Sequence, residues 1–197
     1  MPVTVTNLLA GAGVLWRAPV AGAAEPATAQ TAIAAPWIDL GATQDGVKVN
    51  VDRKFFELEI DQVVDKPGRR LTNREVTLTA NLAEATLENW AIANDELVSL
   101  VVASGTLGTA AGVFTPTNDI SAFNPGYSAL IFEGFAPQSG PTGLRRRRVI
   151  ARRVLSVDSV ESSYKKDGQV LVPVKWATHY VSPTIAPYAI QEDRSTL

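Results

Sequence analysis

Two segments of the chain, 47–63 and 71–82, place apolar side chains at every second position and polar side chains between them. A period of two is the pattern of a β-strand with one buried face. Pro67-Gly68, in the loop between the two segments, predicts a turn. Strands of more than ten residues are longer than the usual five or six. The chain is therefore expected to build a long hairpin of the kind found in barrels and extended sheets.

The rest of the chain predicts more strands and a single helix. Apolar residues fall at helical spacing over 83–94, acids occupy the first turns, where the helix dipole favours them, and Asn94 can end the helix. Further strands are expected over 14–20, 127–135, 144–162 and 169–181, with a turn at 166–168 before the last. The predicted class is mainly β, with one helix beside the strands.

Composition excludes much enzyme chemistry. The chain has no cysteine and one histidine, His179, so disulfides, thiolate zinc sites and cysteine nucleophiles are excluded. No nucleophile elbow, phosphate-binding loop or dinucleotide fingerprint follows a predicted strand. Paired carboxylates can serve a glycosidase, but acids at alternate strand positions usually face water. We expect no enzyme activity, no catalytic residue, no cofactor and no metal site.

Charge is scarce at the N-terminal end, where residues 1–36 carry only Arg17 and Glu25. This stretch is expected to be an extended arm, followed by a β domain over 37–184 and a tail over 185–197. No run reaches the ~18 apolar residues of a membrane helix, and no basic segment precedes the first apolar run. We therefore expect synthesis in the cytoplasm without export.

A run of arginines at 145–148, continued by Arg152 and Arg153, is the most conspicuous charge feature. Arginines bind phosphates electrostatically, which makes DNA affinity one interpretation. The net charge of −2 gives no overall basic footprint, and consecutive residues of a strand alternate faces. The favoured interpretation is solvation or salt bridges with acidic strands of a neighbouring copy.

The order of motifs over Gly11–Asn94 resembles the major tail tube protein of long-tailed, non-contractile phages. It comprises an apolar arm (GAGVLWRAPVAGAAEP), then W-x-D-L-G-x-T-x-D-G-V from Trp37, a strand ending E-x-D-Q at Gln62, and N-L-A-E-A-T-L-E-N from Asn81. The C-terminal half matches that family mainly in its order of strands. These motifs are turn and packing patterns, without a chemical signature.

The resemblance implies a β-sandwich or split barrel with a flanking helix. In that family six copies form a ring whose hairpins join into an inner barrel. Rings stack into a tube around a tape-measure protein, a terminator protein ends the tube, and double-stranded DNA passes through without specific binding. The protein would then be made in the host bacterial cytoplasm and reside in the virion tail, with no membrane partner. The expected lumen-lining residues are Glu57, Glu59, Asp61, Glu75, Thr77, Thr79 and Asn81.

Contacts between subunits are expected at the arm, at the 64–70 loop and at the arginine run. The candidates are Trp16, Trp37, Val64, Asp65, Lys66, Pro67, Arg69, Arg70, Arg146 and Arg148. Two alternatives stay open. One is a phage protein that stops at a single ring, such as a terminator or distal tail protein. The other is a monomeric β-barrel binding module with a closed pocket.

Overall fold

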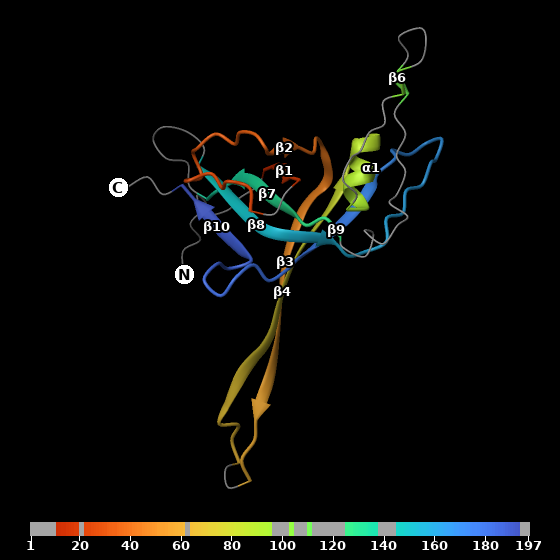
Figure 1. Cartoon of the computed structure of the whole chain (residues 1–197). Helices are drawn as coiled ribbons and strands as arrows, with labels where there is room; N and C mark the ends of the chain where they lie inside the picture. Colours follow the sequence, from red (N-terminus) through yellow and green to blue (C-terminus); the bar gives the residue numbers. More distant parts are fainter. Residues whose placement is uncertain are drawn as a thin grey trace, which may run out of the picture.

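The computed structural model describes residues 11–19, 22–61, 64–95, 103–104, 110–111, 125–137 and 145–193. In this part of the chain the fold is mainly β, with one short helix. Eight strands form one antiparallel sheet in the order β2-β1-β7-β8-β9-β4-β3, and β10 also pairs with β8 (Figure 1). The strands of this sheet are β1 (Val14–Ala18), β2 (Ile38–Asp39), β3 (Thr43–Leu58), β4 (Gly68–Leu82), β7 (Ser128–Phe135), β8 (Arg146–Ser156), β9 (Val172–Thr178) and β10 (Tyr188–Glu192). The short strands β5 (Ala103–Ser104) and β6 (Ala110–Ala111) pair with each other.

Both ends of the described chain contribute strands to the main sheet. β1 pairs with β2 and β7, and its Leu15 and Ala18 are fully buried. β10 pairs with the first half of β8, whereas the last residues of β8 pair with β9. The expected arm (1–36) and tail (185–197) therefore each contain a strand of the main sheet, β1 and β10 respectively.

Asp45-Gly46, which directly precedes the period-two segment 47–63, lies inside β3. Gln44 pairs with Asn81 and Val47 pairs with Ala80, so the two residues between them have no partners on β4. Both have positive φ, 63° and 73°. Asparagine, aspartate and glycine tolerate this region better than other residues. The Asp-Gly pair therefore makes a bulge that β3 passes through, and the strand begins four residues earlier than its period-two pattern.

The main core lies under helix α1 (Leu87–Ala93). Thr86 caps the helix, its hydroxyl accepting a hydrogen bond from the backbone N–H of Asn89 at 3.2 Å. Asn94 ends the helix, as the sequence predicts. The buried Asn89 amide donates to the carbonyl of Leu40, which fixes the helix to the chain entering β3. The buried members of this core are Leu15, Leu40, Leu78, Ala80, Leu82, Ile92, Ala93, Leu130, Ala151, Val154, Val172, Val174 and Trp176.

The opposite face of the sheet is covered by residues 22–37, which we call the strap. Ala129, Ile131 and Ile150 point to this side, because they alternate with the core residues Leu130 and Ala151 along β7 and β8. Ala23, Ile33 and Trp37 of the strap pack on that surface. The low charge of the N-terminal stretch thus has an explanation within one chain, since the strap rests on its own sheet.

Candidate assembly surface

The β3–β4 hairpin divides into two halves of different surroundings. In the proximal half, residues 77–82 of β4 pair with 172–177 of β9, and Val76, Leu78, Ala80 and Leu82 are buried. The distal half, 51–58 of β3 and 68–75 of β4, pairs only within the hairpin. It projects from the body as a two-stranded ribbon (Figure 1), which we call the distal ribbon. An isolated two-stranded hairpin is marginally stable in water, so this extension lacks the support that its length requires.

The distal ribbon carries large apolar side chains in the open. Phe56 is 60 % exposed and Phe55 50 %, and Leu58 and Leu71 are similarly exposed. Single exposed apolar residues are ordinary on protein surfaces, but a group of them marks an interaction surface. Strand edges that carry such side chains are templates for pairing with another chain. The distal ribbon is therefore the strongest candidate for an interface among the described residues.

A bulge at Thr72 decides which residues of the hairpin share a face. Lys54 pairs with Asn73 and Phe55 pairs with Leu71, so Thr72 is an extra residue on β4. Cross-strand partners share a face, and β3 alternates regularly through this point. Counting along β3 therefore places Glu57 on the opposite face of the hairpin from Glu75.

The expected lumen-lining residues consequently do not form one surface. Glu75, Thr77, Thr79 and Asn81 do lie together, on the face of β4 turned away from the buried Leu78. Glu57 belongs to the other face, and Glu59 and Asp61 lie beyond the end of β3, in the turn of the hairpin. Lys48 pairs with Thr79 on the Glu75 face, so that face mixes charges rather than being acidic.

The expected contact loop at 64–70 lies at the far end of the ribbon. Its members Val64, Asp65, Lys66, Pro67, Arg69 and Arg70 are all exposed. Lys66 bonds with the carboxylate of Glu57, and Arg69 Nη2 lies 3.0 Å from Glu57 Oε1. The hydrogen bond from Lys66, with the positive charges of Lys66 and Arg69, lowers the pKa of Glu57. These pairs tie the turn to the ribbon and leave the apolar side chains free.

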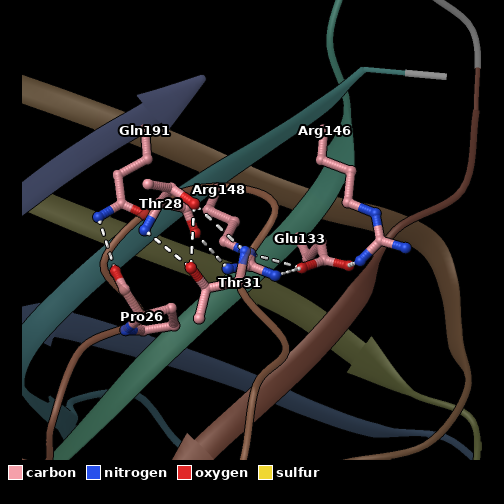
Figure 2. Close-up of polar contacts among 7 residues, drawn as sticks. All are labelled: Pro26, Thr28, Thr31, Glu133, Arg146, Arg148 and Gln191. Carbon is pink, nitrogen blue, oxygen red and sulfur yellow. Dashed lines mark hydrogen bonds and ion pairs between the residues drawn. The ribbon is translucent and has the colours of Figure 1, made fainter. Parts of the chain in front are cut away.

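The arginine run lies mainly against the strap, because even-numbered residues of β8 share the face of Ile150. Figure 2 shows the centre of this cluster. Arg148 is completely buried; its Nε donates to Glu133 Oε2 at 2.5 Å and its Nη1 to the carbonyl of Thr28 at 2.8 Å. Arg146 pairs with the same glutamate at 3.2 Å. The expectation that Arg148 contacts a neighbouring copy is therefore wrong, since its guanidinium is enclosed by its own chain.

Two neighbouring arginines also have acidic partners within the chain. Arg147 pairs with Glu192 of β10, and Arg152 pairs with Glu25 of the strap. These pairings fasten the strap and β10 to β8, and they leave little free positive charge for DNA. Sequence reasoning missed Glu25, Glu133 and Glu192 as partners. A signal existed for Glu133, an acid inside an otherwise apolar strand.

The two tryptophans expected at subunit contacts pack within the chain. Trp37 is 7 % exposed, and its Nε1 donates to the carbonyl of Ala24 at 2.9 Å. That expectation is wrong for Trp37, because its ring belongs to the core under the strap. Trp16 is half-buried against the same core. Together these side chains hold the strap to the sheet.

A half-buried acid that the sequence did not reveal, Asp95, lies where α1 ends. Asp95 has positive φ, and one carboxylate oxygen accepts a hydrogen bond from the backbone N–H of Ser156. Burial raises the pKa of Asp95 to about 6, opposed by that hydrogen bond and by the charge of Arg17. Arg17 is itself buried, at 5 % exposure, and burial lowers its pKa. These two charged groups lie in the body, away from the distal ribbon.

No group of three or more potential metal ligands occurs among the described residues. In the same part of the chain, no helix has the length and apolar character needed to cross a membrane. His179 makes an edge-to-face contact with the ring of Tyr127, at 5.2 Å between centroids.

No family model matches the sequence of this chain, and no curated protein matches it.

Proposed function

We propose that this protein is a structural subunit that assembles with copies of itself into stacked hexameric rings, forming the tail tube of a phage with a long, non-contractile tail. Genomic DNA would pass through the tube, and tape-measure and terminator proteins would be its other partners. Its fold would be the split barrel or sandwich of that family. The motif order over Gly11–Asn94 supports the family, and the mainly antiparallel β fold is compatible with it.

The observation that carries the proposal is the distal ribbon. A free monomer gains nothing from a ribbon that pairs only with itself and exposes Phe55, Phe56 and Leu58 to water. Pairing with the ribbons of neighbouring copies would supply the missing hydrogen bonds and flank these side chains with those of the adjacent strands. Closing the ribbons into a barrel removes every edge except those at its rims. The ribbon thus gains its stability from the assembly.

The face of the hairpin carrying Glu75, Thr77, Thr79 and Asn81 is the proposed lumen wall. It lies opposite the core face of β4, so ring closure can leave it open while the body surrounds the barrel. This face also carries Phe56 and Leu58 of β3. Its mixture of hydroxyl, amide, apolar and oppositely charged groups lacks the dense positive charge that makes grooves hold DNA. DNA would therefore slide past it. Glu57 is excluded from this wall by the bulge at Thr72.

Electron microscopy of the purified chain tests the proposal. We expect tubes of uniform diameter that grow with protein concentration. A variant with Phe55→Ser and Phe56→Ser should keep the circular dichroism spectrum of the folded protein but form no tubes. A matched control, Tyr164→Ser, changes an aromatic residue that is 75 % exposed on the body, and it should assemble normally.

Other outcomes separate the alternatives. Rings that never stack would indicate a terminator or distal tail protein. Featureless monomers at every concentration would contradict the proposal and favour a binding module. Salt-sensitive retention of the monomer on DNA would support the DNA-binding interpretation of the arginine run, which its internal ion pairs disfavour.

A further inference from the structure

An apolar groove opens on the body beside the strap. Its volume is about 580 Å³, and its lining includes Ala24, Trp37, Tyr127, Ile150, Val181 and Ile185. The walls are held by Arg152, which pairs with Glu25 on the strap and donates to the carbonyl of Ala186 at 2.7 Å on the other side. Ile185, at the rim, is 46 % exposed. The groove is therefore a built feature with an apolar floor that nothing among the described residues fills.

Positive charge accompanies the apolar floor. Arg153 also lines the groove, with its guanidinium carbon 3.8 Å from the centre of the Tyr127 ring and one nitrogen donating to the carbonyl of Tyr180. Its described contacts include no carboxylate partner. A ligand that joins apolar side chains to negative charge would match both features.

The described residues of the hairpin turn, 59–61 and 64–67, have that chemistry. Val64 is fully exposed and Ile60 is 49 % exposed. The acids Glu59, Asp61 and Asp65 lie in the same turn and are exposed. Of these, none makes an ion pair within the described residues, because Lys66 is engaged with Glu57. The turn therefore presents apolar side chains among unpaired acids.

The turn cannot reach the groove of its own chain. The distal ribbon extends about 26 Å, at roughly 3.3 Å for each residue from Val51 to Leu58, and it points away from the body (Figure 1). Only a second copy can bring a turn to this groove. A contact between two different patches of the same protein is heterologous, and it repeats from copy to copy into a ring or an open-ended assembly.

We propose that the groove is the receptor for the hairpin turn of a second copy in the next ring. This inference rests on the proposed function and adds the partner surface for the turn. Val64 and Ile60 would cover the floor between Trp37 and Ile185, with the acids of the turn near Arg153. The lateral joining of ribbons and the stacking of rings would then use separate parts of one hairpin.

Cross-linking through introduced cysteines tests the contact directly, because the chain has no cysteine of its own. Tubes of a Val64→Cys/Ile185→Cys variant, treated with a short bis-maleimide, should give a ladder of covalent multimers on a denaturing gel. The matched control is Val64→Cys/Ile190→Cys. Ile190 is 58 % exposed, but it pairs with Val149 and so lies on the opposite sheet face from Ile150. The control should give no ladder.

A second pair of variants blocks the groove. Ala24→Trp places an indole over its floor, whereas Ala27→Trp adds the same side chain at an exposed strap position outside the lining. Ala24→Trp should raise the concentration needed for tube formation about tenfold, equivalent to about 1.4 kcal/mol per contact. Ala27→Trp should leave it unchanged.

The outcomes distinguish this inference from the proposed function. Tubes that show no ladder with Ile185→Cys, or equal ladders with both pairs, would overturn the inference and leave the function standing. Normal assembly of Ala24→Trp would overturn it too. If the unaltered chain forms no tubes at any concentration, the proposed function fails and this inference fails with it.

Discussion

The proximal and distal halves of the β3–β4 hairpin have similar strand-forming sequences and opposite surroundings. In the proximal half every second residue of β4, from Val76 to Leu82, is buried against the core. In the distal half all residues of β4 from Arg69 to Glu75 are exposed, and so are the phenylalanines opposite them. The difference lies in what pairs with the strands, since β9 borders only the proximal half.

The two halves of the hairpin therefore differ in the source of their stability. The proximal half obtains its stability from folding of the single chain. In the distal half, Arg74 lies over the ring of Tyr188 at 5.7 Å, but no side chain is buried. We therefore expect this half to depend on contacts between chains. Substitutions in the two halves should therefore change different measurements, and four experiments test this distinction.

The largest expected effect is on the proximal core. Leu78→Ala removes a fully buried side chain and should lower the free energy of unfolding by about 2–5 kcal/mol. Leu71→Ala, at a position 48 % exposed, should change it by less than about 0.5 kcal/mol. Urea denaturation of the monomers measures both. Equal losses would contradict the division of the hairpin into two halves.

The alternation of residues was enough to predict which side chains of the proximal half turn inward. It could not predict the exposure of the distal half, because a period of two tells which face an apolar residue occupies and not whether anything covers that face. The bulge at Thr72 has no marker comparable to Asp45-Gly46, so the face of Glu57 was assigned incorrectly. The burial of Arg148 depends on its hydrogen bonds to Glu133 and to the carbonyl of Thr28, and the three residues come together only in the folded chain.

A half-buried acid in the body sharpens the contrast with the exposed ribbon. The pKa of Asp95 is raised to about 6 from 3.8, so the folded chain binds a proton more tightly than the unfolded chain. Stability from this group is present below about pH 4 and is lost as the pH rises through 6. Asp95→Asn, which can still accept the Ser156 N–H, should stabilise the protein at pH 8 by about 1–2 kcal/mol, less than the full pKa shift because solvent screens this half-buried group.

The same variant should match the original chain near pH 4, where Asp95 is protonated. Thermal melts at the two pH values provide the measurement. A gain that is equal at both would show that the carboxylate charge is not responsible.

Hydrogen exchange separates the halves without any substitution. In the monomer, amides of Thr77–Leu82, between β3 and β9, should exchange more slowly than those of the distal ribbon. On assembly the distal amides should gain protection on the order of tenfold or more, while the proximal ones change little. Distal amides that are already protected in the monomer would count against our account of the ribbon.

The smallest effect is expected at the ion pairs of the ribbon. Glu57→Gln removes the carboxylate bound by Lys66 and Arg69, but exposed pairs contribute little to stability. The monomer should show no measurable change in its denaturation midpoint. The lowered pKa of Glu57 predicts a slight loss of stability in acid, as the pH falls below its unfolded value near 4.5, and only in the original chain. A marked change at pH 7 would place Glu57 in a more enclosed setting than the structure shows.

The pairing of β4 with β9 also has a mechanical consequence. A pull on the hairpin turn along the ribbon acts parallel to both strands, so the backbone hydrogen bonds between 77–82 and 172–177 are loaded together. Bonds loaded in parallel resist more force than bonds peeled apart one at a time. The hairpin can thus transmit tension between the turn and the body while β4 stays paired with β9.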